Sequence, residues 1–263
     1  EISEALEYDL PPNNKFWVGR KKEIQNISTD IFKVIFITGI GGQGKSALAA
    51  HYIRNCFDSN SFEFADWRDF KEETNRFQTK LISTIKRISN NKVTAKQLDN
   101  ASNVELVDIF FQNLDDKKIV FVFDNIDSYI DLETFMPSGG IKYFFDQALE
   151  INHNSKFIFT CRPFIREAGP NFYQLTLTGL SEEESEEMFL LYNIPIKKNL
   201  ISELSQRAFK LTTGHPLWMN LIVAQAVRGI DTVNKFIQKI EDKTDFNEDG
   251  FSSILSEKIL NEV

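Results

Sequence analysis

The sequence predicts an α/β protein with a doubly wound, mostly parallel five-stranded sheet, followed by a small all-helical domain. Two observations support this prediction. Up to residue 178, short apolar runs rich in β-branched residues alternate with stretches of helical spacing, which is typical of parallel strands joined by crossover helices. From Gly179 onward only the helical spacing remains, so we expect the architecture to change there.

The first apolar run, residues 33–38, leads through a glycine-rich loop into a stretch of helical spacing. Residues 39–46 read Gly-Ile-Gly-Gly-Gln-Gly-Lys-Ser and fit the phosphate-binding pattern G-x-x-x-x-G-K-[ST]. Glycines let main-chain N–H groups close around phosphate oxygens, and the helix N-terminus favours the same anion. The pattern predicts a P-loop NTPase that binds ATP or ADP, with Lys45 on the β- and γ-phosphates and Ser46 on Mg²⁺. The residues expected around the phosphates are Gly39, Gly41, Gly42, Gln43, Gly44, Lys45, Ser46 and Ala47.

A second apolar run, residues 117–123, predicts a central strand that is buried on both faces and ends at Asp124. Ligands of doubly wound sheets bind at the carboxyl ends of the strands, so we expect Asp124 to hold Mg²⁺ together with Ser46. The alternative is that Asp124 only caps the following turn. Asp127 either polarises the attacking water or caps the next segment. Asn125 cannot accept a proton as a carboxylate does, so we expect slow hydrolysis.

A third run, residues 156–160, predicts another strand, and Arg162 follows it at the carboxyl end. The planar guanidinium suits phosphate oxygens, so Arg162 is predicted to sense the γ-phosphate. The simpler alternative is an ordinary surface arginine.

Residues 16–24, just before the phosphate loop, admit two interpretations. They start a helix, with Trp17 packing on the core, or they form a lip over the nucleotide base that Arg20 positions.

The composition and net charge of the chain argue against some classes of binding partner. The chain has 263 residues, of which 42% are hydrophobic and 26% charged, as in globular proteins of one large or two small domains. A net charge of −8 argues against a nucleic-acid surface as the main source of affinity. No apolar run reaches membrane-spanning length, and no signal peptide is evident, so we expect a cytoplasmic protein without a membrane partner. Cys56 and Cys161 are expected to be buried free thiols. Because the chain begins without Met, we expect a fragment or a processed chain.

Four stretches are expected along the chain. They are a polar lead-in (1–15), the α/β nucleotide-binding domain (16–178), a helical lid domain (179–242), and the truncated start of a further helical or winged-helix region (243–263). Further strands are predicted at 61–70 and 172–177, a loop at 128–140 and a helix at 251–262. Ser181 and Glu184 form a predicted capping box, and Pro216 is predicted to stand just inside a helix start.

These motifs occur in an order that resembles the STAND ATPases, the NB-ARC and NACHT type of signalling nucleotidase, over roughly residues 15–228. The resemblance rests on five elements: residues 16–20, the phosphate loop, residues 124–127, residues 160–162, and Gly214-His215-Pro216-Leu217. It implies that Val18, Arg20 and Pro216 contact the adenine end. It also implies rest with ADP, exchange for ATP when a protein ligand is sensed, and homo-oligomerisation that switches on an effector. Asn125 departs from the NB-ARC pattern, which has a second acid there, although Asp127 fits the NACHT-like spacing.

The first functional hypothesis is therefore the ATP/ADP switch and oligomerisation module of a STAND protein, a slow ATPase acting in immune or antiviral defence. One alternative is a DNA-associated AAA+-like ATPase of the origin-recognition or loader type, which should carry Asp-Glu at 124–125 and a basic surface. Another is a scaffold that binds nucleotide without hydrolysing it.

Overall fold

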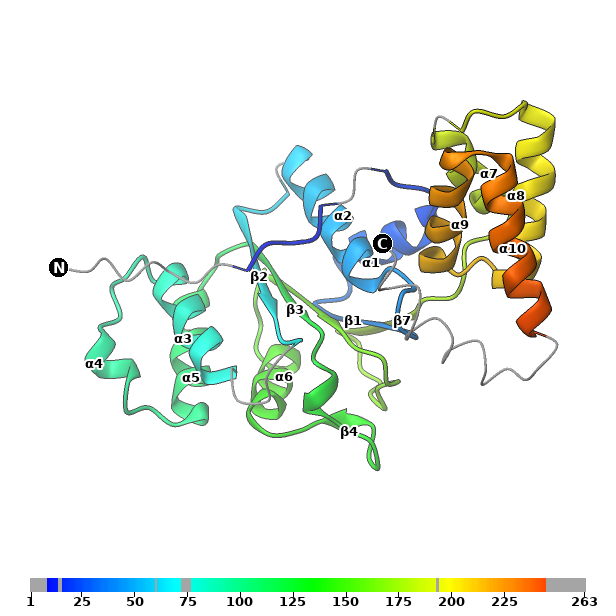
Figure 1. The fold of residues 1–263 in the computed structure, drawn as a ribbon. Coiled ribbons are helices and arrows are strands. Elements are labelled where there is room, and N and C mark those ends of the chain that lie inside the picture. Colours follow the sequence, from blue (N-terminus) through cyan, green and yellow to red (C-terminus); the bar gives the residue numbers. More distant parts are fainter. Residues whose placement is uncertain (1–8, 14–15, 60, 72–76, 193, 245–263) are drawn as a thin grey trace. The chain divides into compact units, whose positions relative to one another are not determined.

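The computed structural model describes residues 9–13, 16–59, 61–71, 77–192 and 194–244. They form two compact units (Figure 1). The first unit comprises Arg20–Leu177 together with residues 9–13 of the N-terminal segment. The second comprises Phe16–Gly19 and the described residues from Thr178 to Thr244. The helix predicted at 251–262 lies outside the described residues.

A five-stranded parallel sheet forms the centre of the first unit, so the predicted fold class is confirmed. The strands run in the order β2-β3-β6-β1-β7, and every neighbouring pair is parallel. Because all strands point the same way, their carboxyl ends share one edge, and Asp69 of β2 is in register with Asp124 of β3. The strand bounds are β1 Val34–Thr38, β2 Phe64–Asp69, β3 Ile119–Asp124, β6 Lys156–Thr160 and β7 Phe172–Thr176.

Helices cover both faces of this sheet (Figure 1), which explains why the central strands are apolar throughout. α1 (Lys21–Ser28) and α2 (Lys45–Asp58) pack together on one face. α3 (Phe77–Ile88), α5 (Asn103–Leu114) and α6 (Gly140–Glu150) pack on the other. A single turn, α4 (Ala95–Leu98), lies between α3 and α5.

Phenylalanine rings fill the second of these interfaces. The Phe110 and Phe144 ring centroids lie 5.0 Å apart, and those of Phe121 and Phe157 lie 5.1 Å apart. Such offset and edge-to-face pairs add to the burial of large apolar surfaces. This packing holds β3 and β6 in place, and with them the polar residues at the carboxyl ends of both strands.

Residues 128–140, predicted to be a loop, contain more structure than expected. A 3₁₀ turn at Asp127–Tyr129 leads into a short antiparallel pair of β4 (Ile130–Asp131) and β5 (Met136–Pro137). The turn between them is closed by Asp131, whose Oδ1 accepts the N–H groups of Glu133 and Thr134 at 3.0 and 2.7 Å. Strands of two residues leave almost no periodicity in a sequence, so this element could not be recognised there.

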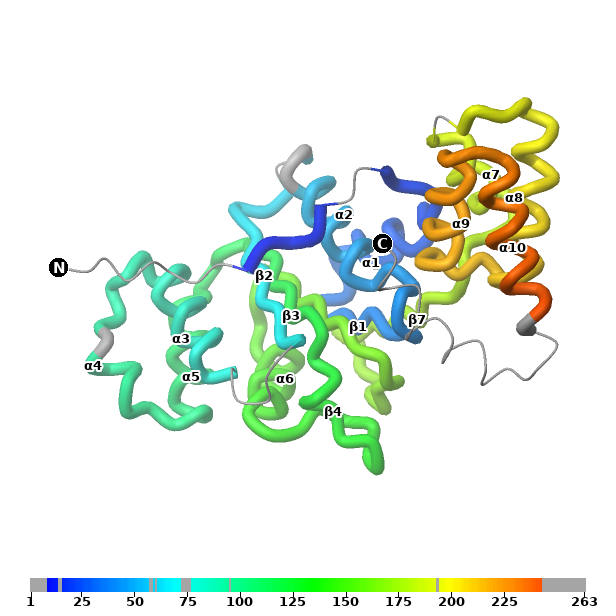
Figure 2. Tube along the Cα trace, in the orientation of Figure 1, coloured from blue at the N-terminus to red at the C-terminus, as the bar shows by residue number. Residues whose placement is uncertain are grey.

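Downstream of Thr178, the regular elements among the described residues of the second unit are all helices: α7 (Glu182–Leu191), α8 (Lys198–Thr212), α9 (Pro216–Arg228) and α10 (Ile230–Thr244). The predicted capping box is present, because Ser181 and Glu184 exchange hydrogen bonds at the start of α7. Pro216 opens α9, as predicted. Figure 2 follows these helices along the Cα trace.

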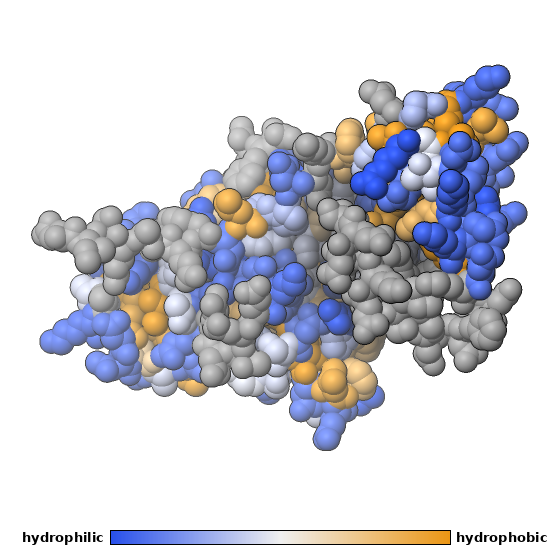
Figure 3. Space-filling model, viewed as in Figure 1, coloured by the Kyte–Doolittle hydropathy of each residue, from blue (hydrophilic) through white to orange (hydrophobic). Residues whose placement is uncertain are grey.

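The part of the chain that the structure describes includes no helix that is both long and apolar enough to cross a membrane. Hydrophilic residues cover most of the described surface visible in Figure 3.

Cys56 and Cys161 are both buried and free, as predicted. Burial raises the pKa of the Cys161 thiol to about 12, so this thiol stays protonated.

Gly214 gives a stability test for the second unit. Its φ is 71°, and a Cβ at this position would lie 2.0 Å from the backbone oxygen of Leu180. Gly214→Ala should lower the melting temperature of the helical unit, since the backbone strain of about 1–3 kcal/mol is joined by a backbone clash. Circular dichroism on heating measures this change.

Gly229→Ala is the matched control, because Gly229 also has a positive φ, 129°, but has no atom within 4 Å of the added Cβ. It should destabilise less than Gly214→Ala. Equal melting temperatures for the two variants would contradict the steric argument.

Candidate functional site

The phosphate loop lies where the sequence placed it, between the end of β1 and the start of α2 at Lys45. Gly39 has a φ of 137°, and a Cβ there would meet the backbone oxygen of Leu177 at 2.8 Å. This position therefore requires glycine for both conformation and space. Gly44, with a φ of 89°, has no atom within 4 Å of an added Cβ, so the loop is open on this side.

Lys45 folds back onto its own loop. Its Nζ donates to the carbonyls of Gly39 and Ile40, at 2.7 and 3.0 Å. Burial lowers the pKa of the Lys45 ammonium, whereas the nearby carboxylate of Asp127 opposes this shift. The ammonium thus lies inside the loop, held by carbonyls that a phosphate can replace as hydrogen-bond acceptors.

Asp124 is the buried centre of the site. Its Oδ1 accepts the hydroxyl of Ser46 at 2.8 Å and also the hydroxyl of Thr160, which stands at the end of β6. The residue is only 4% exposed, and burial raises the pKa of its carboxyl; the two hydroxyl donors oppose that rise. The hydrogen bond between Ser46 and Asp124 brings together the two predicted Mg²⁺ ligands.

Asn125 adopts the left-handed conformation, with a φ of 59°, which asparagine tolerates better than most residues. Its N–H donates to the Thr160 hydroxyl at 2.9 Å. Its side-chain amide donates to two carboxylates: Oδ2 of Asp124 at 3.2 Å and Oδ1 of Asp69 at 2.9 Å. The amide therefore joins the carboxyl ends of β2 and β3.

Asp127 and Arg162 lie together. The Arg162 N–H donates to Asp127 Oδ1 at 2.9 Å, and the guanidinium Nε lies 3.7 Å from the same oxygen. The Arg162 side chain is 74% exposed, so it can move towards a bound phosphate without breaking a buried contact. Its role as sensor and the role of Asp127 at the water stay predictions.

Arg20 is buried and turned towards the phosphate loop. It ion-pairs with Glu23 at 3.0 Å, and its Nη2 donates to the carbonyl of Gln43 at 3.5 Å. Gln43 is itself buried, and its Oε1 accepts no hydrogen bond from the described residues. An unsatisfied buried acceptor beside an open glycine loop is compatible with a ligand that brings its own donors.

Val18 and Pro216 belong to the second unit. Val18 packs on the core of the helical unit, and Pro216 is the first residue of α9. Trp17 donates its indole N–H to the Gly19 carbonyl at 3.2 Å. The adenine contacts of Val18, Arg20 and Pro216 therefore stay predictions.

Sequence reasoning missed two residues of the site, Thr160 and Asp69. Thr160 had a visible signal, since it is the polar residue that ends an apolar strand, but its partner could not be read from the sequence. Asp69 also ends a strand. Its proximity to Asp124 depends on β2 and β3 being neighbours, which only the sheet order reveals.

A model of the NB-ARC domain family matches residues 20–190, well over half of the chain. This chain belongs to the NB-ARC domain family. The match includes the phosphate loop, Asp124 and Arg162, and it confirms the resemblance to STAND-class P-loop ATPases. No curated protein sequence matches the chain.

Solved structures with the same fold include a STAND protein with a tetratricopeptide-repeat sensor from Pyrococcus horikoshii. The TM-score is 0.64 at 23% identity over 92% of this chain, and this NB-ARC chain spans 34% of that protein. A Walker-type ATPase of Pyrococcus abyssi is similar with a TM-score of 0.54 at 14% identity, over 90% of this chain and 75% of that one. Drosophila ORC bound to DNA is similar with a TM-score of 0.59 at 13% identity, over 92% of this chain and 64% of that one. At these identities the likeness shows the fold alone.

Thr160→Val tests the buried hydroxyl that joins Asp124 to the Asn125 N–H. The substitution keeps the shape but leaves a buried carboxylate and a backbone N–H each without one partner. Each lost partner costs about 1–3 kcal/mol, so the free energy of unfolding of the nucleotide-free chain should fall by at least the lower figure. Urea unfolding measures it.

Thr29→Val is the control for this substitution, since the Thr29 hydroxyl makes an exposed bond to the Asn26 carbonyl. It should change the free energy of unfolding little. If Thr160→Val were equally neutral, the hydroxyl would not hold the site together.

Proposed function

We propose that this NB-ARC domain is a nucleotide-dependent switch that binds ADP or ATP with Mg²⁺ and hydrolyses ATP slowly. The observation that carries the proposal is the hydrogen bond between Ser46, the second residue of α2, and Asp124 at the end of β3. It unites the phosphate loop with an acidic strand end beside the Lys45 ammonium. That combination of hydroxyl, carboxylate and ammonium suits a metal-bound triphosphate.

The residues present fit both groups chemically. Oxygen ligands are what Mg²⁺ prefers, and Ser46 and Asp124 supply a hydroxyl and a carboxylate. Bound Mg²⁺ would neutralise charge on the phosphates. The Lys45 ammonium would exchange its carbonyl partners for phosphate oxygens, which form stronger, charge-assisted hydrogen bonds.

Switching requires contacts that differ between ATP and ADP, because a ligand shifts an equilibrium only by its differential affinity for the two states. Lys45 and Arg162 are the cations that we assign to the γ-phosphate. Arg162 is exposed and only loosely paired with Asp127, so it suits a group that engages one nucleotide and releases the other.

Slow turnover follows from Asn125. An amide next to Asp124 cannot accept the proton of an attacking water, so the position that carries a second acid in the NB-ARC pattern contributes no base here. Slow hydrolysis suits a switch, since the ATP state then persists long enough to act.

Oligomerisation on activation, a sensed protein ligand and a role in immune or antiviral defence rest on the family alone. These functions belong to whole STAND proteins, and this chain spans about a third of the STAND protein it resembles in structure. Oligomerisation, ligand sensing and a role in defence are the context in which we propose that this switch works.

Lys45→Ala should remove measurable affinity for both ATP and ADP in calorimetry. Each charge-assisted hydrogen bond contributes about 1.5–3 kcal/mol, so the loss of two weakens binding by more than about 100-fold. Lys142→Ala, which removes an exposed lysine of α6, should bind like the wild type. Unchanged affinity in Lys45→Ala would refute the phosphate site.

Arg162→Ala should weaken ATP by about 10-fold or more and ADP by less than about 3-fold, because only ATP offers the γ-phosphate. Competition of both nucleotides against a fluorescent analogue measures the two affinities. Arg166→Ala, four residues along the same segment, is the control. Equal losses for ATP and ADP would refute the sensor role.

A further inference from the structure

Asp69 is the one carboxylate at the end of β2, and it lies beside Asp124 without being part of the predicted site. The two residues are in register on neighbouring parallel strands. The Asn125 amide nitrogen bridges them, with 2.9 Å to Asp69 and 3.2 Å to Asp124. The backbone therefore brings a second acid to the strand edge at which position 125 itself lacks one.

The Asp69 side chain is held in place rather than loose. Its Oδ1 accepts the Lys71 N–H at 3.0 Å in addition to the Asn125 amide. Both hydrogen bonds that this carboxylate receives from the described residues end on Oδ1. The residue is half-buried, and the two bonds to Oδ1 restrict the orientation of its carboxylate.

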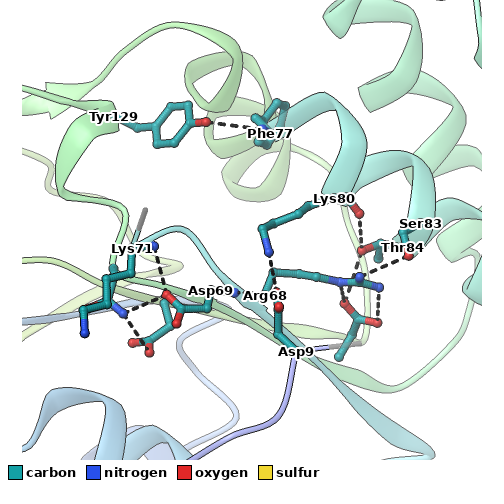
Figure 4. Close-up of polar contacts among 12 residues, drawn as sticks. Asp9, Arg68, Asp69, Lys71, Phe77, Lys80, Ser83, Thr84 and Tyr129 are labelled. Atoms are coloured by element: carbon teal, nitrogen blue, oxygen red, sulfur yellow. Dashed lines mark hydrogen bonds and ion pairs between the residues drawn. The ribbon is translucent and has the colours of Figure 1, made fainter. Parts of the chain in front are cut away.

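The N-terminal segment supports Asp69 from the other side. Asp9 Oδ2 accepts the Asp69 N–H at 2.8 Å and the ammonium of the buried Lys80 at 2.5 Å (Figure 4). The described part of this segment passes beside β2 in Figure 2. The backbone at Asp69 is thus anchored, as a positioned reactive group requires.

Asp66, the other acid of β2, serves as a contrast. It is almost fully buried and accepts hydrogen bonds from Arg68 and Arg87, so its charge is balanced within an internal ion-pair cluster. The simplest structural role for Asp69 is a turn cap for the Lys71 N–H. A turn cap does not account for the hydrogen bond from the Asn125 amide, which links Asp69 to Asp124, the acid proposed to hold Mg²⁺.

We propose that Asp69 is the proton acceptor for hydrolysis in this domain and substitutes for the acid that Asn125 lacks. The inference rests on the proposed ATPase function. A water proton passes to Asp69 Oδ2 while the water oxygen bonds to the γ-phosphorus. The bond from that phosphorus to the bridging oxygen breaks, its electron pair stays on the departing ADP, and the proton later leaves to solvent.

Asp69→Asn is the decisive variant because it retains the shape and an acceptor oxygen for Lys71 and Asn125. Phosphate release from Mg²⁺–ATP by the whole chain should fall by about 100-fold, the usual contribution of a general base. Affinities for ATP and ADP should stay within about 3-fold of the wild type. Asp69→Glu retains a proton acceptor and should turn over faster than Asp69→Asn.

Asp146→Asn, which changes a partly exposed acid on α6, should leave turnover unchanged. If Asp69→Asn released phosphate within 3-fold of the wild type, the inference would be overturned while the proposed hydrolysis would stand. The same holds if Asp127→Asn lost turnover and Asp69→Asn did not. A wild type that binds ATP but releases no more phosphate than Lys45→Ala would overturn both the inference and the proposed hydrolysis. A wild type that binds no nucleotide would overturn the switch as a whole.

Discussion

The Asp124 carboxylate is the constraint on which the site depends. A buried carboxylate is costly unless donors surround it, and here the donors come from different elements: Ser46 of α2, Thr160 of β6 and the Asn125 amide. Meeting that need fixes the phosphate loop against two strand ends before any ligand arrives. Burial still raises the pKa of the Asp124 carboxyl, because these donors replace only part of the solvation that the carboxylate has lost.

Patterns confined to a few neighbouring residues carried most of the sequence-based prediction. The phosphate loop, the apolar strands and the capping box at Ser181 are local, since each depends on residues that touch across one turn or one strand. The short β4–β5 pair was missed because it is too small to produce a period. At the adenine end, the residues themselves left a base lip and a helix start both open for 16–24, and the contact expected of Pro216 came through the family alone.

Contacts between strands explain what the sequence could not supply. Thr160 and Asp69 are separated from Asp124 by 36 and 55 positions, and they meet it only because β3 lies between β2 and β6. Local periodicity gives the strands but not their order. A polar residue at the end of each parallel strand is the usable signal, because all such ends share one edge, although it identifies candidates without pairing them.

Asn125 shows how the strand edge accommodates two acids. Two like charges about 4 Å apart repel by roughly 4 kcal/mol at the effective dielectric of a protein surface, so a third carboxylate at this position would strain the edge before any cation binds. The amide instead donates to both Asp69 and Asp124 and holds them together. An amide at this position therefore removes one negative charge from the edge and also supplies the donor that ties two carboxylates together.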